Sequence, residues 1–108
     1  MKILKTLAVA VGIATCAVTA MAQNYPDKPI KIVVPFPAGG GTDNLTRMIA
    51  NAVNVKYGWT IVVENKPGAG GNLALETVAK SKPDGYTLVM AQTDNVVLNP
   101  LLYKKLNY

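Results

Sequence analysis

The sequence contains no histidine and only one cysteine, Cys16, and these shortages exclude much of the usual enzyme chemistry. Cys16 lies in the segment interpreted below as a signal peptide, so we expect the mature chain to have no thiol and no disulfide. Zinc and copper sites rely mainly on histidine and cysteine ligands, and nucleophilic catalysis relies on a cysteine or on a serine paired with a base. A G-x-S-x-G motif is also missing. We therefore expect no catalytic residue, no metal site and no cofactor.

Charged residues are few and do not cluster. Eleven basic residues stand against six acidic ones, and the formal net charge of +5 falls to +3 if Lys2 and Lys5 leave with the signal peptide. Lys104 and Lys105 are the only adjacent basic pair. Because a nucleic-acid-binding surface needs a denser basic patch or stripe, the composition argues against nucleic acid as a partner.

The first 22 residues have the three parts of a secretory signal peptide. Lys2 and Lys5 form a positive start, residues 7–18 are apolar but too short to span a bilayer comfortably, and residues 20–22 match a small-x-small cleavage site. We predict that residues 1–22 are removed and that the mature chain, residues 23–108, is exported. A domain of about 86 residues without disulfides must be held together by packing alone.

The mature chain alternates short apolar runs with helical patterns. Three runs rich in β-branched residues predict strands at 30–34, 60–64 and 86–91. Helices are predicted at 42–57, from Asn72 as the cap residue, and at 99–106. The first of them carries one apolar stripe, formed by Leu45, Met48, Ile49, Ala52 and Val53, and Gly58 follows where a left-handed residue commonly ends a helix. This order predicts an α/β fold, a parallel sheet with flanking helices and right-handed crossovers.

All three corners that lead from a strand into a helix should lie on the same edge of such a sheet. These corners are 35–43, 65–72 and 92–95. Ligands of open α/β sheets bind at this carboxyl edge, so we expect a binding site there.

The first corner, "PFPAGGGTD", has the features of an anion site. Gly39, Gly40 and Gly41 let a ligand approach the backbone closely, and the helix start adds free N–H groups and partial positive charge. Asp43 is either a first-turn acid favoured by the helix dipole, or a group that orients the loop or accepts from a ligand amine or water. Phe36 is either a core residue or one wall of a pocket.

The second corner, residues 67–72, suggests a competing function. Gly68 and Gly70 match the start of a dinucleotide-binding fingerprint, and Asp94 lies at a plausible distance for a ribose-binding acid. Leu73 stands at the third glycine position, and the predicted export removes the chain from cytosolic nucleotide pools. A nucleotide-dependent α/β enzyme remains the alternative on these residues.

Four motifs in this order resemble one known family. They are "YPDKPIKIVVPFPAGGGTD", "VVENKPGAGGN", "KPDGYTLVM" and "NPLLYKKLNY", and together they cover essentially the whole mature chain. The sequence resembles the Bug family of periplasmic solute-binding proteins, the receptor components of tripartite tricarboxylate transporters. The resemblance implies a two-lobed periplasmic binding protein of type II, located in the periplasm of a Gram-negative bacterium. It also implies no enzymatic activity.

The resemblance further implies a small carboxylated solute: a di- or tricarboxylate, an amino acid or an aromatic acid. Membrane permease subunits are possible partners. The first corner would hold one carboxylate through backbone N–H groups and ordered water, and the other corners would border the cleft. The implied ligand-binding residues are Phe36, Pro37, Ala38, Gly39, Gly40, Gly41, Thr42, Asp43, Gly70, Gly71, Asn72, Thr93 and Asp94.

Members of that family are roughly three times as long as this chain. By resemblance, residues 23–108 correspond to the N-terminal part of domain 1, a partial first lobe. We expect such a piece to bind solute weakly or not at all alone, and to expose an apolar edge that lowers solubility or drives association. A small exported module that binds another protein is the remaining alternative.

Overall fold

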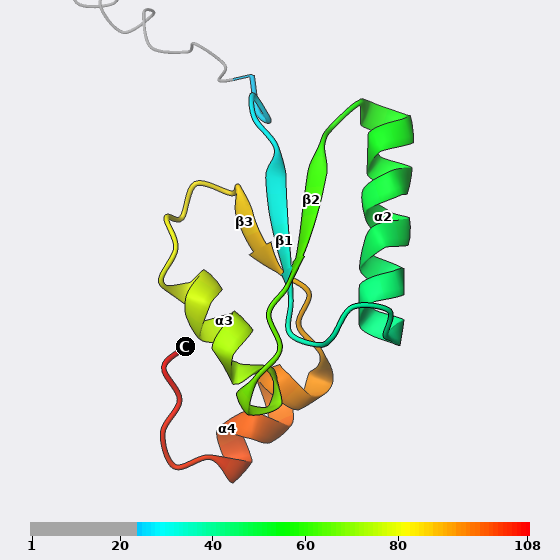
Figure 1. Ribbon diagram of the computed structural model, residues 1–108. Coiled ribbons are helices and arrows are strands. Elements are labelled where there is room, and N and C mark those ends of the chain that lie inside the picture. The colour runs from blue at the N-terminus through cyan, green and yellow to red at the C-terminus, as the bar shows by residue number, and fades with distance from the viewer. Residues whose placement is uncertain (1–23) are drawn as a thin grey trace, which may run out of the picture.

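Strand β1, Ile30–Val34, forms the centre of the sheet because four of its five residues are buried and apolar. The computed structural model describes residues 24–108, so the predicted signal peptide lies outside the described residues. Strands β2, Ile61–Asn65, and β3, Thr87–Val89, pair with β1 on either side, both in parallel. The predicted parallel sheet is confirmed, with the strand order β2-β1-β3 (Figure 1).

Strand β3 is shorter than the predicted run 86–91, and Pro35 supplies the physical reason. The β3 ladder contains the bonds from Lys31 N–H to the Tyr86 carbonyl (2.8 Å) and from Met90 N–H to the Val33 carbonyl (2.9 Å). The next β1 donor in this alternating pattern would be residue 35, and proline has no N–H. The ladder therefore stops, and the chain leaves the sheet after Met90.

The strand order also defines where the sheet changes direction. The chain goes from β1 to β2 on one side and then crosses back to β3 on the other side of β1. In open α/β sheets the ligand-binding crevice lies at such a switch point, outside the carboxyl ends of the strands. Here that point lies between the ends of β1 and β3. All three strand arrows in Figure 1 lead toward the same lower end of the sheet, where the three predicted corners meet.

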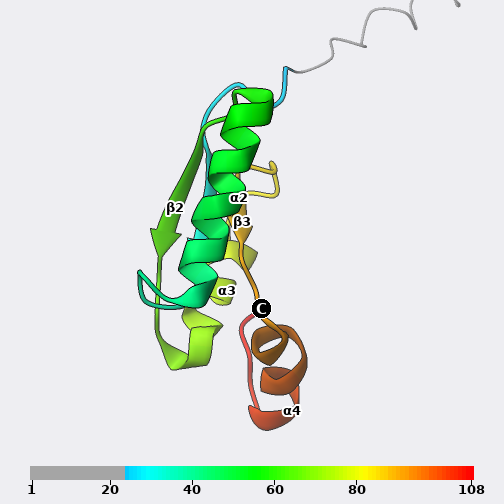
Figure 2. The ribbon, with the colours of Figure 1, turned by 90° about the vertical axis from the view of Figure 1, so that its right-hand side faces the viewer.

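Helix α2, Gly41–Tyr57, begins one residue before its predicted start and ends where expected. Gly58 adopts a left-handed conformation (φ 70°), and its N–H donates to the Asn54 carbonyl at 2.8 Å. The helix packs on β2 and β1. Its position relative to the sheet is seen best in Figure 2.

The predicted apolar stripe of α2 does not face the sheet. The buried side chains of α2 are Asp43, Thr46 and Ala50, whereas Leu45 is 52% exposed and Met48 is 69% exposed. An apolar periodicity shows which residues share a face but not what covers that face. Among residues 24–108 no element covers the stripe, as the exposure of Leu45, Met48 and Ile49 shows.

The second half of the described chain differs from prediction at both of its later helices. A short 3-10 turn, η2 (Ala69–Gly71), precedes α3 (Asn72–Ala79), and the cap position is Gly71 rather than Asn72. The end of the third predicted corner is helical, because Asp94 opens a π-helical turn, η3 (Asp94–Leu98), which continues into α4 (Asn99–Leu102).

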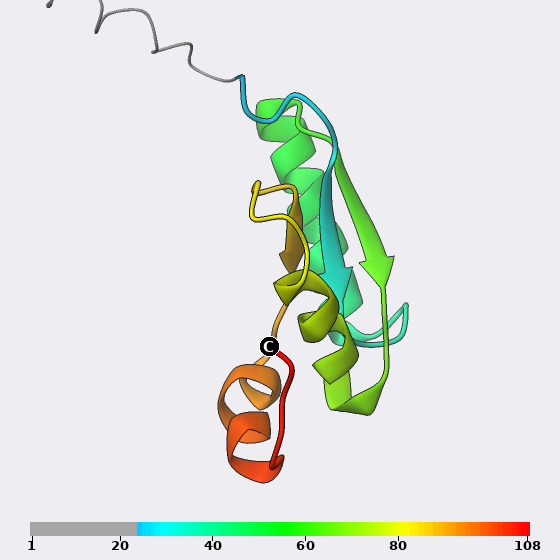
Figure 3. The same cartoon turned by 90° about the vertical axis from the view of Figure 1, so that its left-hand side faces the viewer.

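Helix α4 ends four residues before the predicted position 106. Tyr103 is extended (φ −98°, ψ 129°), and the chain then turns back toward α3 (Figure 3). The Tyr108 hydroxyl lies 2.8 Å from both Asn72 Oδ1 and the Asn95 carbonyl, and its single proton is shared between these two acceptors. These bonds hold the returning segment in place, which explains why helical periodicity stops early.

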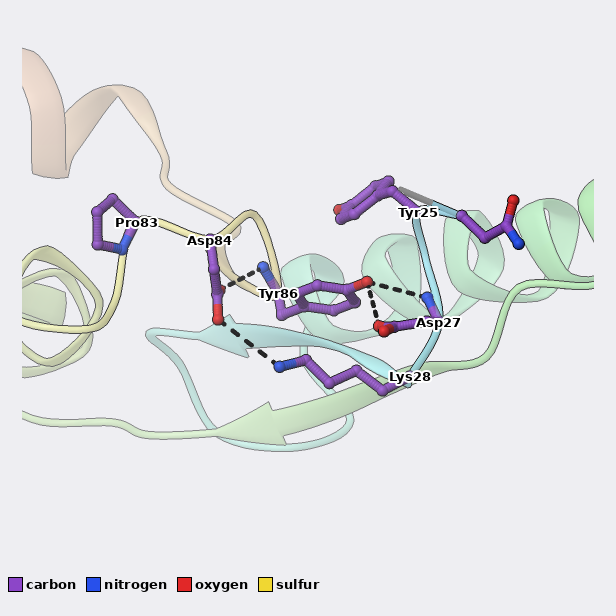
Figure 4. A pocket seen from close by; sticks show the side chains of 7 residues that line it. Tyr25, Asp27, Lys28, Pro83, Asp84 and Tyr86 are labelled. Atoms are coloured by element: carbon purple, nitrogen blue, oxygen red, sulfur yellow. Dashed lines mark hydrogen bonds and ion pairs between the residues drawn. The ribbon is translucent and has the colours of Figure 1, made fainter. Parts of the chain in front are cut away.

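The opposite end of the sheet is fastened by the first residues of the described chain. Tyr86, just before β3, donates from its hydroxyl to Asp27 Oδ1 (2.6 Å) and accepts from the Asp27 N–H (2.9 Å) (Figure 4). Lys28 forms an ion pair with Asp84 at 3.7 Å, and its ammonium lies 4.3 Å from the centre of the Tyr86 ring. The segment before β1 is thereby attached to the turn before β3.

We expect the Tyr86→Phe substitution to lower the stability of this attachment without disturbing the ring contacts. It removes both hydrogen bonds with Asp27, so the urea midpoint should fall by a few tenths of molar to about 1 M. Tyr57→Phe is the matched control, because no hydrogen bond of the Tyr57 hydroxyl is found within residues 24–108. Equal midpoints for the two variants would show that the Tyr86–Asp27 bonds contribute little.

Candidate functional site

The three predicted corners are brought together at the carboxyl end of the sheet, and side chains connect each to another. The Gln92 amide, in the third corner, donates to the Thr42 hydroxyl in the first. The Asn95 amide donates to the Gly70 carbonyl in the second corner at 2.8 Å. The expectation that distant corners share one edge is confirmed.

The first corner presents an uncapped helix start to solvent. Gly40 precedes α2 in an extended conformation (φ −74°, ψ 170°) and no side chain caps the helix there. The N–H groups of Gly41, Thr42 and Asp43 have no acceptor within the helix, because no helical turn precedes them to supply carbonyl groups. Gly39 has a φ of 84°, a backbone conformation that favours glycine and lets a ligand come close to the loop backbone. This geometry suits an oxyanion.

Asp43 is turned into the protein and holds the loop. Its side chain is 3% exposed, and its two oxygens accept from the Gly39 N–H (2.8 Å), Arg47 Nε (3.1 Å) and Asn65 Nδ2 (3.0 Å). Arg47 Nη2 adds an ion pair at 3.0 Å. The sequence leaves several roles open for Asp43, and these contacts match the role of orienting the loop. Arg47 and Asn65 were not among the predicted site residues. The contact of Arg47 could have been predicted, because Asp43 and Arg47 lie four residues apart on one helix.

Donors around Asp43 also lower its pKa. Hydrogen bonds from Arg47, then from the Gly39 N–H and Asn65, and the charge of Arg47 lower the pKa of Asp43 from 3.8 to about 2, while desolvation opposes the shift. The carboxylate therefore stays ionised through the neutral and mildly acidic range.

Two further residues of the first corner have structural contacts. Phe36 is half-buried, and its carbonyl accepts from Asn65 Nδ2 at 3.1 Å. Pro37 is exposed, and its carbonyl accepts from the Gly40 N–H at 3.4 Å. Ala38 is exposed beside them. The backbone of the corner is thus shaped internally, while the helix start remains open.

The second corner has fewer free donors than the sequence suggests. In the η2 turn, the Gly71 N–H donates to the Gly68 carbonyl at 2.9 Å and the Asn72 N–H donates to the Ala69 carbonyl. Gly71 is buried and Gly70 is exposed. The Asn72 side chain accepts from Asn99 Nδ2 at 2.5 Å. The second corner therefore forms a turn, held by its own hydrogen bonds, at the carboxyl edge of the sheet.

The third corner places two predicted residues in solvent. Thr93 and Asp94 are both exposed at the start of η3. Gln92, which sequence reasoning did not select as a site residue, contacts the first corner directly through Thr42. Its position directly after a strand at the carboxyl edge was the available signal.

A hollow of about 390 Å³ lies at the switch point. It is lined by Gly41, Thr42, Leu45, Met90, Ala91 and Gln92. One wall therefore carries helix N–H groups, another carries an amide, and the rest is apolar. A larger hollow of about 700 Å³ lies at the other end of the sheet (Figure 4), but its charged residues Asp27, Lys28 and Asp84 already contact partners around Tyr86. The smaller hollow is the better candidate site because it has unpaired donors.

Within the described part of the chain, no three histidine, cysteine, aspartate or glutamate side chains are grouped to hold a metal ion. None of the helices found between residues 24 and 108 is long and apolar enough to cross a membrane.

A parallel α/β sheet with an open helix start at its switch point occurs in several classes of α/β protein, and the solved structures that match this chain are periplasmic transport and binding proteins. The sequence model described as "Tripartite tricarboxylate transporter family receptor" (TctC) matches residues 45–108, more than half of the chain. This chain belongs to that family of solute-binding receptors.

Relatives of known sequence and structure agree with this assignment. Protein BugT of Bordetella pertussis is 37% identical over 92 residues, which are 85% of this chain and 28% of BugT. The structure of Rpa4515 from Rhodopseudomonas palustris with adipate is 38% identical, with a TM-score of 0.74 over 79% of this chain and 28% of that one. MatC from the same species, with bound malate, is 38% identical, with a TM-score of 0.73 over 78% and 29% of the two chains. This chain thus spans less than a third of the length of these relatives.

The family assignment also decides between two of the functions that the sequence left open. The family consists of periplasmic receptors rather than enzymes. The nucleotide-dependent enzyme inferred as an alternative from residues 67–72 is therefore not supported.

Proposed function

We propose that this chain provides one side of a cleft for a small carboxylated solute, as the N-terminal part of the first lobe of an exported receptor. The observation that carries the proposal is the hollow between the start of α2 and the segment after β3, which is lined by the uncapped helix residues Gly41 and Thr42 and by Gln92. One carboxylate binds at Gly41 and Thr42, with Phe36–Gly40 shaping the loop. Asp43 orients this loop from behind, and residues 70–72 and 93–94 border the cleft.

The class of solute follows from the donors and from the named relatives. Backbone N–H groups and an amide suit any carboxylate, and MatC and Rpa4515 were solved with malate and adipate. Both are dicarboxylates, so one carboxylate at the helix start leaves the second for the facing side of the cleft. The remaining parts of the proposal are a signal peptide at residues 1–22, a periplasmic location and membrane permease subunits as partners.

Binding by this chain alone is expected to be weak, because one side of a cleft buries only part of a ligand. In NMR titrations with malate and adipate up to tens of millimolar, we expect amide shifts at residues 39–43 and 92–94 without saturation below about 1 mM. The neutral dimethyl ester of malate, at the same ionic strength, is the control ligand and should cause no such shifts.

Two results would contradict the proposal in different ways. Shifts that are absent, or equal for malate and its ester, would show that the α2 start is not a carboxylate site. Micromolar affinity in calorimetry would show that the second side of the cleft is not needed. The other candidate function, a module that binds another protein, has no specific observation in its favour.

A further inference from the structure

We propose that Asn95 is a positioning residue that fixes the second corner against the third, and so sets the spacing between two borders of the cleft. The inference rests on the proposed function, because it concerns the same edge of the sheet. It goes further by assigning a role to a residue that does not face the hollow. Asn95 acts through the Gly70–Gly71 peptide rather than by contact with solute.

The Asn95 side chain is fully buried, with 0% of its surface exposed, and both of its polar atoms are used. Its Nδ2 donates to the Gly70 carbonyl at 2.8 Å, and its Oδ1 accepts from the Gln92 N–H at 3.2 Å. One amide thus bridges Gly70 and Gln92, which border different corners. Leaving a buried amide without its partner costs more free energy than the hydrogen bond contributes. The folded chain therefore strongly favours this arrangement over alternatives.

Both ends of the Gly70–Gly71 peptide are held. Its carbonyl accepts from Asn95, and its N–H donates to the Gly68 carbonyl at 2.9 Å. Rotation of this peptide would break a bond on either side. The position of the second corner therefore follows from the position of Asn95.

Gly71 has the shape that this contact requires. A Cβ at residue 71 would lie 2.4 Å from Asn95 Nδ2 and 3.1 Å from Pro35 Cβ, and the φ of Gly71 is 90°. The Asn95 amide thus occupies the space that a side chain at residue 71 would need. This glycine is explained by packing against Asn95, independently of any ligand.

A second amide contact reinforces the first. Asn99, which is 6% exposed, donates from Nδ2 to Asn72 Oδ1 at 2.5 Å and to the Gly70 carbonyl at 3.4 Å. The Tyr108 hydroxyl lies on the other side of the cluster, where Asn72 Oδ1 and the Asn95 carbonyl both accept from its single proton. Segments η2, α3, η3 and α4 are joined at one point, next to the proposed site.

Asn95→Asp tests the role because it keeps the shape of the side chain but replaces the donor by a carboxylate. At pH 7 the ionised group would face the Gly70 carbonyl, and hydrogen–deuterium exchange at Gly71 and Asn72 should rise at least tenfold relative to β1 amides. Protonation restores a donor, and burial raises the pKa of a carboxyl group, so protection should recover as the pH is lowered toward 5. Asn51→Asp, on the exposed surface of α2, is the matched control and should leave these amides unchanged.

A general loss of packing would raise exchange equally at residues 71–72 and in β1, without recovery at lower pH, and would overturn the proposal. If the variant does not fold, the wild-type chain still decides: the Asn95 side-chain NH₂ should exchange at least tenfold more slowly than that of Asn51. Equal rates would overturn the proposal as well. These measurements need no solute, so their failure is distinguishable from a failure of the malate titration.

Discussion

Replacement of Asp43 by alanine should release the first corner and remove part of the acid sensitivity of the chain. The substitution leaves Arg47, Asn65 and the Gly39 N–H without their shared acceptor. Asp43 is buried and Arg47 is half exposed, so the substitution leaves the donors of a partly buried, charge-assisted network without an acceptor. We expect the melting temperature at pH 7 to fall by roughly 10 °C.

The pH dependence has a definite sign. The pKa of Asp43 is about 2 in the folded chain and about 3.9 in an unfolded one, so its contribution to stability is complete above about pH 4. This contribution is lost as the pH falls from about 4 to 2. The difference in stability between the wild type and Asp43→Ala should therefore shrink across this window.

Other carboxylates contribute to acid unfolding, and the difference between variants separates them from Asp43. Hydrogen bonds from Lys31, Lys80 and the Tyr86 backbone, respectively, lower the pKa values of Glu64, Glu76 and Asp84. These residues are unchanged in the variant. Asp94→Ala is the stability control, because Asp94 is exposed, and it should unfold like the wild type. A pH-independent difference for Asp43→Ala would contradict the assigned role.

Self-association through the outer face of α2 is the second large effect that we expect. Leu45, Met48 and Ile49 form one exposed apolar stripe, with exposed fractions of 52%, 69% and 39%. Strand β3 pairs with β1 on one side only among the described strands, so its other side offers free backbone groups to another chain. Both features favour contact with a second molecule.

Sedimentation velocity over a hundredfold range of concentration measures this effect. Leu45→Gln combined with Met48→Lys removes two large apolar contacts, and burial of each contributes about 1.5–3 kcal/mol. The dissociation constant should therefore rise roughly a hundredfold or more. Leu101→Lys is the control, because Leu101 is 80% exposed on α4, away from the stripe. An equal effect of Leu101→Lys, or a wild-type chain that stays monomeric, would refute the assignment of association to α2.

The order of elements was predictable because local signals agree along the chain. β-Branched runs mark β1 and β2, helical periodicity marks α2, and Gly58 ends that helix in the expected left-handed conformation. A strand that repeatedly leads into a helix implies a parallel sheet, which places the three corners on one edge. The prediction of an anion site at residues 39–43 followed from glycines that precede a helix start.

The details of the edge were not predictable, since they depend on which strand lies next to which. Sequence order does not show that β3 returns to the far side of β1, and only this strand order brings residues 90–92 to the hollow beside the start of α2. The early end of β3 required knowing that Pro35 lies opposite its next pairing position. The outward direction of the α2 stripe likewise depends on what covers the helix.

The sequence by itself determined the fold class, the edge of the sheet where the three corners meet and the family of receptors. Tertiary structure alone decided that Asp43 faces inward and that Asn95 fills the space beside Gly71. Asp43 and Asn65 lie 22 residues apart, and Asn95 and Gly70 lie 25 apart. Local propensity acts over a few residues, whereas these partners meet only after the sheet has brought its corners together.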